Sequence, residues 1–199
     1  MRSRTRWIDD KLGNPTTLLH FWHFNDLPSD EFIDVAADYT VSNGVLIYTG
    51  VGEGYMDSVD DGTLLNADLG APAESALRVR NPSDNRELFF SLPTNDYKDV
   101  VFRYAAKRTP NGARKQTVHY RTGNIEEWTP IGDTLEITKK YQQFRFNFAG
   151  FEEVDDNPEF SIRILFHGDE ASGTSGNNRF DNITLEGHSL YEEDDQEPS

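Results

Sequence analysis

Short runs of alternating hydrophobic and polar residues recur along the chain, and three are regular enough to define a period. They lie near 98–107, 141–148 and 159–166. In the last run, every second position is apolar: Phe160, Ile162, Ile164 and Phe166. Because successive side chains of a strand point to opposite faces, this period predicts strands that bury one face, as in antiparallel sheets. A helix does not fit, since residues i, i+2 and i+4 would spread around its surface.

Weaker alternations bounded by turn residues extend the same interpretation over most of the chain. The expected strands are 18–25, 45–48, 75–80, 86–92, 98–107, 115–121, 134–137, 141–148, 159–166 and 179–186. The segments 26–44 and 49–74 are rich in Gly, Asp and Asn and are expected to form long loops. Many short strands separated by turns predict an all-β fold, an antiparallel β-sandwich.

The domain is expected to span residues 18–187. Residues 1–17 lack periodicity and predict an N-terminal arm or linker. Residues 188–199 are dominated by an acidic run, which predicts a flexible tail. The first residues are basic but are not followed by the apolar stretch of a signal peptide. The chain is therefore either cytosolic or an excised piece of a larger secreted protein, and we favour the second interpretation.

Composition narrows the classes of protein that this fold could represent. Only 36% of the 199 residues are hydrophobic, yet 13 Phe, 8 Tyr and 3 Trp predict an aromatic core between two sheets. The absence of cysteine excludes disulfides, thiol catalysis and cysteine-bound zinc. A net charge of −16 argues against binding to nucleic acid. No apolar run reaches the roughly 18 residues of a membrane span, so membrane insertion is not expected.

A carboxylate interrupts the apolar face of the last expected strand. Asp181, Ile183 and Leu185 lie at alternate positions, so Asp181 is expected to face inward with the two apolar residues. A carboxylate in such a place is costly unless it is hydrogen-bonded, paired with a positive charge or bound to a metal ion. The residue pattern alone leaves these three possibilities open.

Motifs of catalysis are weak or missing. His20 and His23 would point to opposite faces of a strand and cannot converge on a metal ion. The chain lacks the Gly-x-Ser-x-Gly elbow, the P-loop and the Glu-x-Asp-x-x-Glu strand pattern that some sandwich-fold glycosidases use. We therefore expect a protein that is not an enzyme, with a polysaccharide lyase or glycoside hydrolase as a less favoured alternative.

Two aromatic residues are candidates for stacking against sugar rings. Trp128 lies in the turn-rich segment 123–130, and Tyr55 is flanked by glycines that offer it few covering neighbours. Exposed rings of this kind bind the apolar faces of sugars. The alternative for Trp128 is structural packing against the edge of the sandwich. Trp22, in the middle of an expected strand, is interpreted as a core residue.

Basic residues recur on the polar parities of several expected strands. If they share a face, that face is locally cationic and could accept carboxylated or sulfated sugars. Otherwise they pair with acidic residues on neighbouring strands. The set is Arg103, Lys107, His119, Arg121, Arg145 and Arg163.

Several segments, taken in order, resemble one known kind of module. They include LLHFWHFNDLP at 18–28, ALRVRNP at 76–82, RELFFSLP at 86–93 and NNRFDNITLEG at 177–187. The chain resembles the jelly-roll modules of secreted multidomain proteins from Bacteroidetes-type bacteria. Those modules are akin to calcium-containing carbohydrate-binding modules and cleaved-adhesin domains. The resemblance implies a β-sandwich of jelly-roll type and leaves the ligand undefined, because such modules differ in their binding loops.

The same resemblance implies a structural Ca²⁺ ion that ties the first strand to the last. Asp181 matches the carboxylate at the end position, and Asn25 and Asp26 match the end of the first strand. Relatives often carry Glu at the position of Asn25. An oxygen-rich site of this kind suits Ca²⁺.

These observations predict a non-catalytic carbohydrate-binding or adhesion module of a secreted or cell-surface bacterial protein. Its expected partners are a polysaccharide or cell-surface glycan and other domains of a larger secreted chain. The residues expected to contact the ligand are Trp128, Tyr55, Arg121 and Arg145. The alternative is a structural spacer or protein-interaction domain without a small ligand, which buried aromatics and chain ends at opposite poles would favour.

Overall fold

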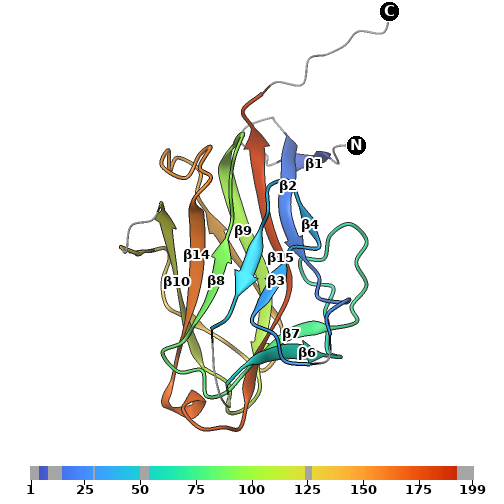
Figure 1. Cartoon of the computed structure of the whole chain (residues 1–199), viewed down its shortest axis with the longest axis vertical. Helices are drawn as coiled ribbons and strands as arrows, with labels where there is room; N and C mark the ends of the chain where they lie inside the picture. Colours follow the sequence, from blue (N-terminus) through green and yellow to red (C-terminus); the bar gives the residue numbers. More distant parts are fainter. Residues whose placement is uncertain (1–4, 9–14, 29, 50–53, 124–126, 192–199) are drawn as a thin grey trace, which may run out of the picture.

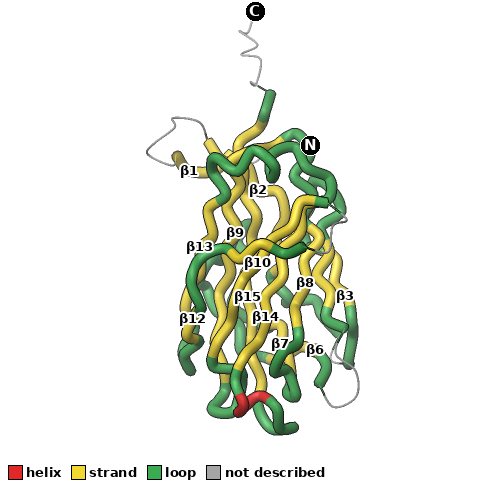
Figure 2. The backbone as a smooth tube through the Cα atoms, turned by 90° about the vertical axis from the view of Figure 1, so that its left-hand side faces the viewer, coloured by secondary structure: helices red, strands yellow, loops and turns green. Residues whose placement is uncertain are grey.

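Two antiparallel β-sheets pack face to face in the computed structural model (Figure 1), which describes residues 5–8, 15–28, 30–49, 54–123 and 127–191. This confirms the predicted all-β sandwich. The described part contains one short 3₁₀ turn, η1 (Asp169–Ala171), at one end of the elongated sandwich (Figure 2). No helix in these ranges is long and apolar enough to cross a bilayer.

The first sheet has eight strands, and β15 runs through its centre. Its strands are β1 (Thr5–Ile8), β2 (Pro15–Trp22), β4 (Tyr39–Thr40), β6 (Met56–Val59), β7 (Ala76–Arg80), β9 (Tyr97–Arg108), β13 (Gln142–Asn147) and β15 (Asn177–Ser189). β15 pairs with β2 and β7 along one edge and with β9 along the other, and β13 lies beyond β9.

The second sheet has seven strands in the order β11, β10, β14, β8, β5 and β3, with β12 also paired to β10. They are β3 (Asp34–Ala36), β5 (Val45–Ile47), β8 (Glu87–Ser91), β10 (Lys115–Thr122), β11 (Thr129–Pro130), β12 (Leu135–Glu136) and β14 (Phe160–His167). β10, β14 and β8 form its longest continuous ladder, and this ladder carries the candidate site.

The strand boundaries differ from the expected ones at both ends of the domain and in two loops. β1 and the start of β2 lie within 1–17, the expected arm, and β15 continues to Ser189. β3, β4 and β6 lie in segments expected to be loops. These strands are two to four residues long, too short for an alternation to stand out from loop sequence.

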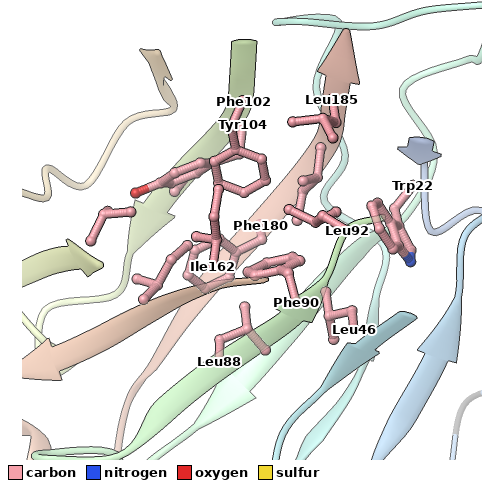
Figure 3. Packing of buried hydrophobic residues seen from close by; sticks show 14 of the residues in the cluster. Trp22, Leu46, Leu88, Phe90, Leu92, Phe102, Tyr104, Ile162, Phe180 and Leu185 are labelled. Atoms are coloured by element: carbon pink, nitrogen blue, oxygen red, sulfur yellow. The ribbon is translucent and has the colours of Figure 1, made fainter. Parts of the chain in front are cut away.

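The core between the sheets is built largely from aromatic rings, as the composition predicts. Trp22 contacts Phe90 edge-on, with ring centroids 6.0 Å apart, and Phe90 contacts Phe102 at 5.3 Å. Phe180 lies against Phe166 at 5.9 Å. Figure 3 shows the rings of Trp22, Phe90, Phe102 and Phe180 among aliphatic side chains such as Leu46, Leu88 and Leu185. Offset and edge-to-face ring contacts of this kind add to the stabilisation from burial.

β15 changes partner halfway along one of its edges. Residues 177–180 pair with β7, and residues 183–187 pair with β2. Asp181 and Asn182 lie between these segments, where the register with β9 shifts and Asn182 adopts a left-handed backbone with φ of 47°. The loop 61–66 fills the gap: Nδ2 of Asn182 donates to the carbonyls of Thr63 and Leu65 at 2.5 and 3.0 Å.

This interruption reverses the expected orientation of Asp181. The irregular register places Phe180 and Ile183 in the core, so Asp181 lies outside the core cluster although it is almost fully buried. Its carboxylate accepts the backbone N–H groups of Thr63 at 2.7 Å and Asn182 at 2.8 Å. The prediction that Asp181 shares a face with Ile183 and Leu185 is therefore wrong.

Candidate functional site

The outer face of the ladder β10, β14 and β8 gathers aromatic and basic side chains. Alternate residues of these strands, such as Val118, Ile162 and Phe90, point into the core, so their neighbours point outward. His119, Arg163 and Phe89 are directly opposite one another across the three strands. Together with Arg121 and Trp128 they form what we call the Trp128 platform.

Trp128 reaches this face because the chain folds back along β10. β11 begins directly after Trp128 and pairs Thr129 with Tyr120 and Pro130 with His119. The indole ring lies 4.7 Å from the guanidinium carbon of Arg121 and 4.6 Å from that of Arg163.

A second aromatic ring supports the indole. The ring of Phe89 meets Trp128 edge-on, with centroids 6.1 Å apart. The guanidinium of Arg121 also lies over Phe89, at 5.5 Å. Cation–π and edge-to-face contacts therefore hold the half-buried indole in a defined position.

The polar groups of the platform are only partly engaged by the protein. A terminal N–H of Arg163 donates to the Glu87 carboxylate at 3.2 Å. His119 Nδ1 and the Nε atoms of Arg121 and Arg163 have no hydrogen-bond partner among the described residues. Burial, with the neighbouring Arg163, lowers the pKa of His119, which favours the neutral imidazole at neutral pH.

The structure brings together only two of the four residues predicted to bind a ligand, Trp128 and Arg121. Tyr55 lies by the edge strand β6 of the other sheet, where the guanidinium of Arg80 covers its ring at 5.2 Å. Arg145 is exposed on β13, also in the other sheet and directly opposite Arg103 of β9. Neither is part of the Trp128 platform.

The basic residues that recur on the polar parities are divided between the two sheets. On the eight-stranded sheet, Arg103 pairs with Glu186 at 2.8 Å and Lys107 with Asp61 at 2.5 Å. These two follow the predicted alternative of pairing with acidic neighbours. Phe89 was not predicted, although Leu88 and Phe90 at core parity indicate that the ring between them faces outward.

The residues expected to share a Ca²⁺ ion have separate partners. Asp181 accepts two backbone N–H groups at the β15 interruption, and burial raises its pKa to about 7. Asn25 instead accepts the N–H of Ser75 at 2.9 Å and donates to the carbonyl of Pro72. The arrangement does not favour one ion held by both, and calcium binding stays a prediction of the resemblance.

Asp26 belongs to a different group, beside a pocket of about 380 Å³. His23, Asp26 and Asp38 each place a possible ligand atom within 4.8 Å of the others. However, Nδ1 of His23 accepts the N–H of Asn25 at 3.1 Å, so the neutral ring carries its proton on Nε2. One oxygen of Asp38 already accepts the N–H of His23 at 2.7 Å. These bonds stabilise the turn after β2, and we assign no ion to the group.

Comparison with known proteins supports the fold. No family model matches the chain, and no curated protein matches it. The tandem CBM22-1–CBM22-2 domain of Paenibacillus barcinonensis Xyn10C has a TM-score of 0.55 at 10% identity, over 94% of this chain and 50% of that one. This chain therefore spans half the length of that tandem. The likeness places the chain in the β-sandwich architecture of carbohydrate-binding modules.

Two further solved structures have lower TM-scores. A family 29 carbohydrate-binding module from Piromyces equi has a TM-score of 0.44 at 8% identity, covering 87% of this chain and 91% of that one. A variant of such a module, complexed with mannohexaose, has a TM-score of 0.43 at 11% identity, with coverages of 86% and 92%. These neighbours are also carbohydrate-binding modules.

Proposed function

We propose that this protein is a non-catalytic carbohydrate-binding module that contacts a polysaccharide through the Trp128 platform. The observation that carries the proposal is the position of Trp128, a half-buried indole fixed over the outer face of a sheet by Phe89 and two guanidinium groups. The sandwich architecture shared with carbohydrate-binding modules is consistent with it.

The platform has the two kinds of contact that sugar recognition needs. A fixed aromatic ring stacks on the apolar C–H face of a pyranose, with little loss of side-chain entropy on binding. Hydroxyl groups at the edge of the sugar require donors and acceptors, which His119 and the two arginines supply around the ring. An extended sheet face offers room for several consecutive sugar units.

A role as an in-line spacer is the competing function from a different class. Such a spacer would have its chain ends at opposite poles, but β1 and the C-terminal end of β15 lie at the same end of the sandwich (Figure 1). The aromatic rings are also not all buried, since Trp128 keeps part of its surface exposed. Both features favour binding over spacing.

The cellular setting is proposed on the resemblance alone. We propose that the module serves a secreted or cell-surface bacterial protein, where it would hold neighbouring domains near a polysaccharide or mediate adhesion. Sequencing the genomic region for a signal peptide and adjoining catalytic domains tests this setting independently of the ligand.

Affinity electrophoresis and a glycan array with neutral and uronic polysaccharides test the binding function. We expect Trp128→Ala to weaken binding by about 5- to 30-fold, because stacking of one ring contributes on the order of 1–2 kcal/mol. Tyr191→Ala is the control, since this exposed tyrosine lies just beyond the end of β15, a strand of the other sheet. Absence of retardation on every polysaccharide, or a Trp128→Ala variant that loses thermal stability but not binding, would overturn the proposal.

A further inference from the structure

The Trp128 platform reverses the charge balance of the rest of the molecule. The chain contains 35 acidic residues and 19 Lys and Arg residues. On the outward parity of β8, β10 and β14, however, Glu87 is the only acidic residue, whereas Arg121, Arg163 and Lys115 are basic, and Lys115 lies 3.7 Å from Glu136 of the adjacent strand β12. From this reversal, and resting on the proposed function, we infer that the platform selects polysaccharides that carry carboxylate or sulfate groups.

Two cations converge on one aromatic ring at the centre of this face. The guanidinium carbons of Arg121 and Arg163 lie 4.7 and 4.6 Å from the indole centre of Trp128, so two positive charges flank one ring. Like charges repel each other, and more strongly where they are partly desolvated. An anionic group bound between or beside them would offset that repulsion.

The two arginines differ in how far the protein already neutralises them. Arg163 forms an ion pair with Glu87 at 3.2 Å. For Arg121, no ion pair with an acidic residue is found within the described ranges, and its recorded contacts are with the rings of Trp128 and Phe89. Aromatic faces attract a cation but leave its N–H donors unpaired. Arg121 is therefore the group best placed to receive an anion from the ligand.

The chemistry of arginine accounts for the class of ligand. A guanidinium offers parallel N–H groups that match the two oxygens of a carboxylate or the oxygens of a sulfate. A hexuronic acid presents a carboxylate at the edge of a ring whose C–H face can stack on an indole. One sugar unit could thus use the aromatic and the cationic parts of the platform together.

Because the whole molecule is negatively charged, we expect recognition of an acidic ligand to be restricted to the platform. A net charge of −16 repels a polyanion at long range, and Glu127 next to Trp128 is exposed. Several basic residues elsewhere form ion pairs with acidic residues, as Arg78 and Arg80 both do with Asp57. An acidic polysaccharide would therefore bind through the platform rather than through the surface as a whole.

The test uses sugars that differ only in charge. Oligogalacturonate and its fully methyl-esterified form share a backbone, and isothermal titration calorimetry gives the affinity of the whole chain for each. We expect the acidic form to bind at least about tenfold more tightly, as one charge-assisted contact would give. A sulfated galactan with its desulfated form provides a second pair for the sulfate case.

Variants separate this inference from the proposed function. We expect Arg121→Gln to weaken binding of the acidic form more than binding of the esterified form, so that the ratio of the two affinities falls at least about fivefold, and Arg145→Gln, on the other sheet, to change neither affinity. Circular dichroism confirms folding of each variant. Equal affinity for both forms, or equal effects of the two substitutions, would overturn the inference while Trp128-dependent binding still upheld the function. Binding of neither sugar pair, nor of neutral glycans on the array, would overturn both.

Discussion

At the scale of single residues, burial favours the neutral form of some ionisable side chains and the ion-paired form of others. His20 is an example, because it is fully buried and its ring is held at both nitrogens. Nε2 donates to the carbonyl of Pro93 at 2.9 Å, and Nδ1 contacts the hydroxyl of Thr40 at 2.8 Å. Since a carbonyl can only accept, Nε2 carries the proton and Nδ1 accepts from Thr40. The histidine side chain therefore links β2 to the segment after β8 through a hydrogen bond.

The state of His20 predicts how stability depends on pH. Burial lowers its pKa from 6.5 to about 4, so the folded state favours the neutral ring. A lowered pKa contributes stability that is complete above 6.5 and is lost as the pH falls from 6.5 to about 4. We expect this loss to reach at most about 3 kcal/mol, from the size of the shift.

Thermal melts between neutral and acidic pH check this prediction. His20→Gln keeps a donor for Pro93 and an acceptor for Thr40 but does not titrate. We expect the variant to be less stable than the natural protein at neutral pH and to lose less stability on acidification. If the two proteins lose the same amount of stability as the pH falls, His20 does not account for the loss of stability at acidic pH.

At the scale of elements, the central strand β15 depends on a loop for its continuity. Its partner changes from β7 to β2, and the loop 61–66 supplies the missing hydrogen bonds through Asp181, Asn182 and Asn66. Nδ2 of Asn66 donates to the carbonyl of Asn182 at 2.6 Å, so the contact runs in both directions. At this edge of β15, the loop therefore supplies hydrogen bonds that a neighbouring strand would otherwise provide.

Substitutions of Asn182 separate the two roles of this residue. Asn182→Gly keeps the left-handed backbone but removes the side-chain bonds to Thr63 and Leu65, for an expected loss of about 1–3 kcal/mol. Asn182→Ala adds the strain of a positive φ and is expected to lose about 1 kcal/mol more. Urea denaturation measures both. Equal losses would mean that backbone strain contributes nothing, and no loss would mean that the loop is not needed for continuity.

The same strand marks the limit of what the sequence predicts. In β9 from Val100 onward, and in β13 and β14, alternate residues face the core, so their pattern predicted the strands and the buried faces. In β15 the two adjacent polar residues Asp181 and Asn182 shift the apolar positions from the parity of Phe180 to that of Ile183, but this shift does not reveal that the strand changes partner there. Trp128 and Arg121 could be proposed separately, but their meeting depends on the pairing of β11 with β10, a two-residue contact. A pairing of two residues is too short to produce a recognisable alternation in the sequence.

At the scale of the whole molecule, the first and last long strands lie side by side in one sheet. β2 and β15 pair directly through their backbones, with Trp22 opposite Ile183 and Phe21 opposite Thr184. The core rings of both strands then pack against the second sheet, as Trp22 does on Phe90. Hydrogen bonds and packing therefore already connect β2 to β15, a connection that the resemblance attributes to Ca²⁺.

Melting temperatures with and without Ca²⁺ decide whether an ion adds to this join. An ion present at a hundred times its dissociation constant would add about 2.7 kcal/mol, or roughly 5–10 °C for a domain of this size. We expect a change below about 1 °C when Ca²⁺ is added to protein treated with EDTA, because Asp181 and Asn25 already satisfy separate backbone groups. Mg²⁺ at equal ionic strength is the control. A rise of several degrees with Ca²⁺ that disappears in Asp181→Asn would instead show that the carboxylate exchanges its amide partners for the ion, and that the first and last strands share it.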